Sequence, residues 1–144
     1  MQVQHILKSK GIDEVYTVTP GTKVSEAAKM LAEKRIGTVV VSKDGSTADG
    51  ILSERDIVRV LARKGGAGLD DAVEEHMTVK LVTCQLADRA DDVLSKMTEG
   101  RFRHMPVVED GMMVGLITIG DAVKARLSEL AMERDALEGM IMGH

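Results

Sequence analysis

Cysteine, aromatic residues and long apolar runs are all scarce in this chain of 144 residues. Its single cysteine, Cys84, excludes a disulfide within the chain and any Cys-x-x-Cys motif for a metal or a redox centre. The chain has one tyrosine, Tyr16, one phenylalanine, Phe102, and no tryptophan, and its net charge is −4. This composition argues against the stacking surfaces and basic stripes of nucleic-acid binders. No apolar run approaches the roughly 18 residues of a membrane span, and the N-terminus lacks the pattern of a signal peptide. We therefore expect a cytoplasmic protein that binds neither nucleic acid nor membrane.

What the sequence does contain is a duplication. Residues 50–56 read Gly-Ile-Leu-Ser-Glu-Arg-Asp, and residues 115–121, located 65 positions later, read Gly-Leu-Ile-Thr-Ile-Gly-Asp. Upstream, residues 36–41 correspond to residues 102–107 with nearly the same displacement. The two halves therefore represent one structural unit written twice.

Each half predicts the element order β-α-β-β-α, so the expected fold class is α/β (mixed α+β). In the first half we expect strands at 15–18, 39–41 and 50–53, a helix from Val24 to Ala32 capped by Thr22 or Ser25, and a helix through 57–61. In the second half we expect a β-prone run at 82–85, a helix at 90–97, strands at 105–108 and 113–118 around a turn at 109–111, and a long final helix that Asp121 opens.

The domain organisation follows from these elements. Residues 1–64 form the first repeat, 65–76 a linker with a short helix, 77–130 the second repeat, and 131–144 a helical extension. The four residues 65–68, Gly-Gly-Ala-Gly, read as a flexible break. Neither half alone covers both faces of its sheet, so we expect the repeats to pack about an approximate two-fold axis, with a ligand in the clefts between them.

The repeated hydroxyl and aspartate pairs, Ser53 with Asp56 and Thr118 with Asp121, have two interpretations. One is a helix N-cap followed by a carboxylate in the first turn, where the helix dipole favours negative charge. The other is a ligand site, since a carboxylate accepts hydrogen bonds from both the 2′- and the 3′-hydroxyl of a ribose. The recurrence of the pair at one place in both repeats favours a shared ligand role.

The two copies differ just before a strand, where Arg103 and His104 of the second half replace Gly37 and Thr38 of the first. Adjacent cationic side chains bind phosphate through charge-assisted hydrogen bonds. The alternative is that Arg103 and His104 are ordinary solvated surface residues.

Taken together, these motifs resemble a tandem pair of CBS (cystathionine-β-synthase) domains, also called a Bateman module, over residues 1–130. The resemblance implies a regulatory sensor that binds AMP, ADP, ATP, NAD or S-adenosylmethionine between the repeats. One implied site combines Ser53, Arg55 and Asp56 with Thr83, Cys84, Phe102, Arg103, His104 and Met105. The other combines Thr118 and Asp121 with Thr17, Thr19, Ile36, Gly37 and Thr38. We expect the first to be the better nucleotide site because it has the basic pair.

Other residues receive simpler interpretations. Cys84 is expected to be a small buried hydrophobe, Phe102 either core or ligand contact, and the ten methionines core filling rather than metal ligands. No metal site and no catalytic motif is predicted, so we expect a binding module and not an enzyme. The alternative function is a constitutive scaffold with degenerate ligand sites.

The last helix carries apolar residues at four- and three-residue spacings that continue toward the C-terminus, interrupted by Arg134. We expect this stripe to contribute to a homodimer, the alternative being that it folds back on its own domain. The resemblance also implies a regulated protein partner.

Overall fold

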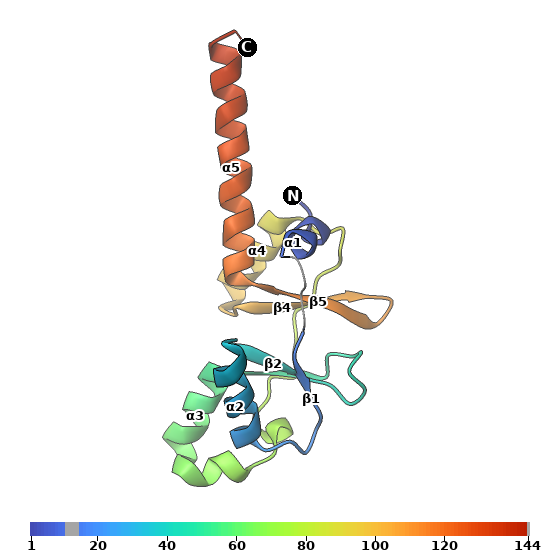
Figure 1. Cartoon of the computed structure of the whole chain (residues 1–144), viewed down its shortest axis with the longest axis vertical. Helices are drawn as coiled ribbons and strands as arrows, with labels where there is room; N and C mark the ends of the chain where they lie inside the picture. The colour runs from blue at the N-terminus through green and yellow to red at the C-terminus, as the bar shows by residue number, and fades with distance from the viewer. Residues whose placement is uncertain (11–14, 144) are drawn as a thin grey trace. The chain divides into compact units, whose positions relative to one another are not determined.

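The computed structural model describes residues 1–10 and 15–143, which fall into two compact units (Figure 1). Among these residues, the first-repeat unit contains 15–82 and 108–114, and the second-repeat unit contains 1–10, 83–107 and 115–143. Each unit has its own buried apolar cluster. The mixed α+β fold class predicted from the sequence is confirmed.

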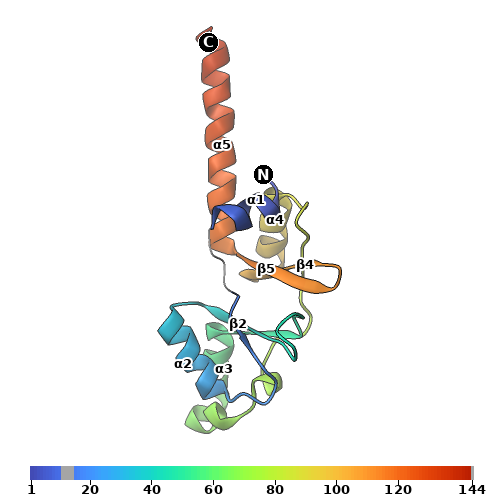
Figure 2. The same ribbon diagram turned by 45° about the vertical axis from the view of Figure 1, so that its right-hand side comes forward.

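The first-repeat unit has the predicted element order: β1 (Thr17–Val18), α2 (Val24–Lys34), β2 (Thr38–Val41), β3 (Gly50–Ser53) and α3 (Glu54–Lys64). Strand β2 is central and fully buried, running parallel to β1 and antiparallel to β3. Helices α2 and α3 lie on the same side of this sheet (Figures 1 and 2). The β-branched residues of β2 therefore fill the centre of this unit's core.

Helix α2 forms as predicted, but its start differs from the expectation. Val24, Ala27 and Leu31 are buried as the apolar stripe requires, whereas Ala32 is exposed. The N-cap residue is Lys23, which makes no side-chain capping bond, so the predicted caps Thr22 and Ser25 are wrong. The helix start is fixed instead by tertiary contact, because the Val24 N–H donates to the Asp71 carbonyl at 2.9 Å.

Residues 65–68 are helical and do not form the flexible stretch that their glycines predict. Residues Gly65–Asp70 form a 3₁₀ helix, and a second 3₁₀ helix, Val73–Glu75, lies in the linker where one short helix was expected. Gly68 is buried against helix α3: a Cβ atom added to it would lie 2.4 Å from Cγ1 of Val60. The glycine here permits close packing, a use that composition alone does not distinguish from flexibility.

The second-repeat unit contains α4 (Ala90–Gly100), β4 (His104–Glu109), β5 (Met112–Thr118) and the long α5 (Ile119–Ile141), as expected. Asp110 and Gly111 both have positive φ, the geometry of a tight hairpin turn between β4 and β5. The β-prone run at 82–85 makes only an isolated bridge between Cys84 and Val107 and forms no strand.

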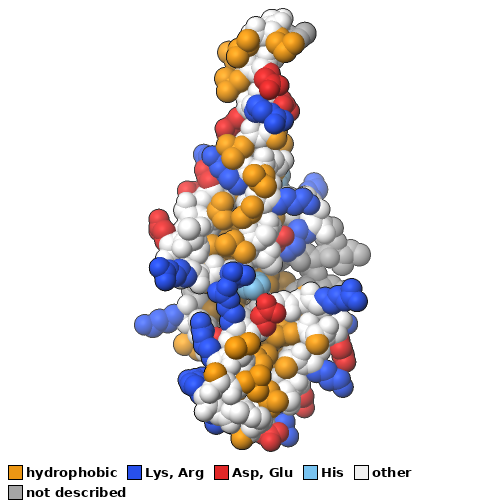
Figure 3. All heavy atoms as spheres, turned by 90° about the vertical axis from the view of Figure 1, so that its left-hand side faces the viewer, with side chains coloured by type: hydrophobic (Ala, Val, Ile, Leu, Met, Phe, Trp, Pro, Cys, Tyr) orange, Lys and Arg blue, Asp and Glu red, His pale blue; other side chains and the backbone are white. Residues whose placement is uncertain are grey.

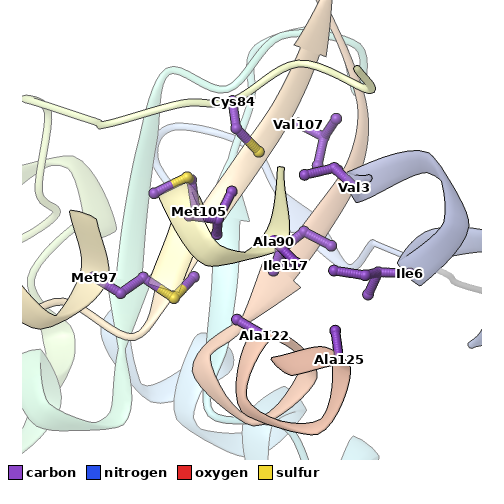
Figure 4. Packing of buried hydrophobic residues seen from close by; sticks show 11 residues of the cluster. Val3, Ile6, Cys84, Ala90, Met97, Met105, Val107, Ile117, Ala122 and Ala125 are labelled. Carbon is purple, nitrogen blue, oxygen red and sulfur yellow. The ribbon is translucent and has the colours of Figure 1, made fainter. Parts of the chain in front are cut away.

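An N-terminal helix completes this core. Helix α1 (Val3–Ser9) buries Val3 and Ile6 in the same cluster as residues of α4, β4, β5 and α5 (Figure 4). The Val3 N–H donates to the Asp88 carbonyl at 2.8 Å, which ties the helix to the segment before α4. The first described residues of the chain thus pack on the second repeat.

Candidate functional site

Both hydroxyl and aspartate pairs form reciprocal helix caps. At α3 the Asp56 N–H donates to Ser53 Oγ at 3.2 Å, while the Ser53 N–H donates to Asp56 Oδ2 at 2.9 Å. At α5 the Asp121 N–H donates to Thr118 Oγ1 at 3.1 Å, and the Thr118 N–H donates to Asp121 Oδ2 at 2.9 Å. The capping interpretation is therefore confirmed at both positions. It leaves the second carboxylate oxygen, Oδ1, outside the cap in each repeat.

A cation lies beside each aspartate, and the two cations come from different parts of the chain. Arg59, one turn further along α3, approaches Asp56 Oδ1 at 3.3 Å, and its own side chain is 70% exposed. Lys10, which follows α1, donates to Asp121 Oδ2 at 2.9 Å and to the Leu116 carbonyl at 3.0 Å. Lys10 is a functional candidate that the sequence analysis missed, because the contact joins residues far apart in the chain.

These contacts set the charge of Asp121. Burial of the carboxyl acts to raise its pKa, but the Thr118 backbone N–H and the Lys10 ammonium outweigh burial, so the pKa of Asp121 lies below its ordinary value. Asp121 is therefore an ionised acceptor at neutral pH, as a carboxylate that binds hydroxyl groups must be.

In each unit, the residue that precedes the middle strand, Gly37 before β2 or Arg103 before β4, is hydrogen-bonded to the start of the helix that carries the aspartate. The Glu54 N–H at the start of α3 donates to the Gly37 carbonyl at 2.9 Å, and the Ile119 N–H at the start of α5 donates to the Arg103 carbonyl at 2.8 Å. Arg103, which is exposed, thus lies next to the first turn of the helix that carries Asp121.

The first residue of that strand, Thr38 in β2 and His104 in β4, also differs between the units. In the first-repeat unit Thr38 is buried, and its hydroxyl donates to the Leu52 carbonyl at 3.1 Å. In the second-repeat unit His104 is half-buried. The backbone of Arg103 is thus bonded to the start of the helix that carries Asp121, while the combination of the basic pair with Asp56 remains a prediction.

Some predicted site residues lie in the core. Cys84 and Met105 are buried in the second-repeat cluster (Figure 4), and burial raises the pKa of the Cys84 thiol to about 12. The thiol is thus protonated and inert, as expected of a small buried hydrophobe. Phe102 is half-buried and packs against the same cluster, with its ring over Gly100. This supports the core interpretation of Phe102.

The remaining predicted residues are at least partly accessible. Thr19, Arg55 and Thr83 are exposed, and Thr17, Ile36 and Gly37 are half-buried.

Within residues 1–10 and 15–143, no group of three or more histidine, cysteine, aspartate or glutamate side chains is placed to hold a metal ion. None of the described helices is long and apolar enough to cross a membrane.

Comparison with known proteins decides the family. The model of the CBS domain matches residues 9–63 and again residues 73–128. The chain belongs to the CBS domain family. The CBS domain-containing protein CBSX3, mitochondrial, of Arabidopsis thaliana is 32% identical over 98% of this chain and 72% of its own length. Other curated CBS proteins are much longer: the chain spans 25% of the Arabidopsis protein CBSCBSPB2, at 27% identity over 94% of this chain.

Solved CBS structures have the same fold. A CBS-domain containing protein from Agrobacterium tumefaciens is 43% identical, with a TM-score of 0.83 over 88% of this chain and 99% of that one. A CBS domain protein from Pyrobaculum aerophilum complexed with AMP is 26% identical, with a TM-score of 0.77 over 92% and 99%. The CBS domain pair of protein MJ0100, in complex with 5′-methylthioadenosine and S-adenosyl-L-methionine, is 25% identical, with a TM-score of 0.77 over 90% and 98%.

Proposed function

We propose that this CBS pair is a regulatory module that binds an adenosine ligand. The observation that carries the proposal is the duplicated cap, which holds a carboxylate at the start of α3 and of α5 with one oxygen outside the capping bonds. The ligands named in the solved relatives, AMP, 5′-methylthioadenosine and S-adenosyl-L-methionine, all contain adenosine. The group they share includes a ribose whose two hydroxyls a single carboxylate accepts.

Asp121 and Asp56 are the proposed ribose acceptors. In the second repeat, Asp121 is held by Thr118 and Lys10, so little conformational entropy remains to be lost when a ligand binds. Arg103, attached to the same helix start, supplies a cation for a phosphate of AMP, ADP, ATP or NAD. The first repeat offers Gly37 and the buried Thr38 at these positions, so it is better suited to a ligand without a phosphate there.

The proposed action is regulation without catalysis. Among the described residues no group of three or more histidine, cysteine, aspartate or glutamate side chains is placed to hold a metal ion, and the Cys84 thiol is buried and protonated. A ligand changes the behaviour of such a module only if it binds two conformations with different affinity. The affected target is then a separate protein, or another part of a longer protein such as the curated relatives.

Thermal unfolding with AMP, ADP, ATP, NAD and S-adenosylmethionine tests the proposal. A ligand at about 100 times its dissociation constant adds about 2.7 kcal/mol to the free energy of unfolding, which shifts the midpoint by several degrees. We expect Asp121→Asn to reduce the shift, and Asp92→Asn, which changes an exposed carboxylate of α4, to preserve it. Absence of a shift with all five ligands would contradict the proposal.

A double-mutant cycle tests which aspartate acts with the basic pair. If Arg103 and Asp121 hold one ligand, then Arg103→Ala weakens binding much less in an Asp121→Asn background than in the wild type. If Arg103 instead acts with Asp56, as the sequence resemblance implies, the same loss of effect occurs in the Asp56→Asn background. Isothermal titration of AMP into the four variants of each cycle measures this coupling.

The second candidate function is a constitutive scaffold, and one observation favours it. Both aspartates already make capping bonds without any ligand, so stability alone accounts for them. The scaffold predicts that Asp56→Asn and Asp121→Asn lower the free energy of unfolding while no adenosine compound binds. The sensor predicts both the loss of stability and the loss of a measurable affinity.

A further inference from the structure

Helix α5 continues well beyond the core that it packs on. Its buried residues, Ala122 and Ala125, lie in the first two turns, and the N-terminal ammonium of Met1 pairs with Glu129 at 3.3 Å. From Leu130 to Gly143 the side chains are exposed, except for half-buried Ala131 and Gly139. A helical segment of this length is marginal in water when nothing packs on it, so its order requires a covering surface.

The exposed face has the spacing of a helix-pairing seam. We define the tail stripe as the residues that alternate four and three positions apart along α5: Val123, Leu127, Leu130, Arg134, Leu137 and Ile141. Leu127, Leu137 and Ile141 are 63%, 60% and 84% exposed, and hydrophobic side chains lie along the helix in the space-filling view (Figure 3). A repeat averaging 3.5 residues brings these side chains onto one stripe that faces another helix.

We propose that the tail stripe pairs with the same stripe of a second copy of this chain, in antiparallel orientation. The charges on and beside the stripe decide between orientations. A parallel, in-register pair stacks Arg134 on the partner's Arg134 in the seam and sets Glu133 against the partner's Glu138. Both are contacts between like charges at the positions that select partner orientation.

The antiparallel pair removes the Arg134 stack and both Glu133–Glu138 contacts, and its one contact between like charges is Glu133 with the partner's Glu133 at the two-fold axis. When Leu127 faces the partner's Leu137, Val123 faces the partner's Ile141, and every apolar residue of the stripe except Leu130 meets another. Leu130 faces the partner's Arg134, whose aliphatic stem covers it while the charged head stays in water. Lys124 then lies beside the partner's Glu138, and the two-fold symmetry of the pair makes each of these contacts twice.

Sedimentation velocity from micromolar to near-millimolar protein tests the surface. We expect the wild type to be a dimer and Leu137→Glu to be a monomer. Met132→Glu is the matched control, since Met132 is also 60% exposed on α5 but lies off the stripe. A monomeric wild type, or a Leu137→Glu variant that stays dimeric, would overturn the proposal, the former pointing to a different protein as the occupant.

Cysteine crosslinking tests the orientation, and the buried Cys84 leaves a low background. Leu127→Cys chains mixed with size-tagged Leu137→Cys chains are expected to form the mixed disulfide, whereas neither variant alone crosslinks. Crosslinking of each variant with itself would establish a parallel pair and overturn the proposal. As an independent readout, Lys124→Glu is expected to weaken the dimer, and adding Glu138→Lys to restore it.

Discussion

The two repeats hold their aspartates in the same cap but surround them differently. Asp56 has Arg59 from its own helix, on a long exposed side chain, whereas Asp121 has Lys10, which follows helix α1 at the other end of the sequence. Before the strand, the first repeat has a glycine and a buried threonine, and the second has an exposed arginine and a half-buried histidine. Duplication thus preserved the backbone arrangement, while the charges around the two aspartates diverged.

The largest effects are expected in the two cores, where the repeats are most alike. Leu52 of β3 and Ile117 of β5 occupy equivalent positions and are both fully buried. Leu52→Ala and Ile117→Ala should each lower the free energy of unfolding by about 2–5 kcal/mol, because each leaves a cavity. Denaturant unfolding measures the loss, and hydrogen exchange shows whether it is confined to the unit that carries the change. Val58→Ala, at an exposed position of α3, is the control.

The next comparison converts one repeat into the other. Arg103→Gly combined with His104→Thr gives the second repeat the residues of the first at these positions. We expect the affinity for AMP to fall by about 10- to 100-fold, which corresponds to the loss of one charge-assisted hydrogen bond of about 1.5–3 kcal/mol. Binding of adenosine, which has no phosphate, should change little, and an equal loss for both ligands would show that the pair does not read phosphate.

The caps should respond equally in the two repeats. Ser53→Ala and Thr118→Ala each remove the hydroxyl that accepts the aspartate N–H at a helix start. Each is expected to lower the free energy of unfolding by about 1 kcal/mol. Ser95→Ala, at an exposed position within α4, should be nearly neutral. Denaturant unfolding of the three variants checks this, and a cap variant as stable as wild type would contradict the capping role.

The sequence pattern predicted those parts of the fold that depend on interactions between residues close together in the chain. The strand Gly50–Ser53, the buried stripe of α2 and both caps were predictable because they depend on residue type and on neighbours within a few positions. The 3₁₀ helix at Gly65–Asp70 was not, because Gly68 serves a close contact with Val60 that only the folded chain creates. The Lys10 contact with Asp121 escaped for the same reason. The sequence singles out Arg103 as a phosphate-binding candidate, but only the bond from the Ile119 N–H to its carbonyl reveals which helix start it lies against.

The smallest expected effect separates the two cations. Because folding lowers the pKa of Asp121, the unfolded chain takes up this proton first as the pH falls below the ordinary value of 3.8. The contribution of Asp121 to stability is therefore fully present above that pH and is lost as the pH falls through the folded pKa.

Lys10→Met removes one cause of the lowered pKa, so it should flatten the acid side of the stability profile, with a loss at neutral pH of about 1 kcal/mol or less. Arg59→Met should change stability even less, because the Arg59 side chain is 70% exposed and that of Lys10 only 23%. Denaturant unfolding at several pH values between neutral and about pH 3 measures both profiles. An acid slope in Lys10→Met equal to that of the wild type would mean that the Thr118 cap alone lowers the pKa of Asp121. Lys10 would then have no part in the pH dependence of stability.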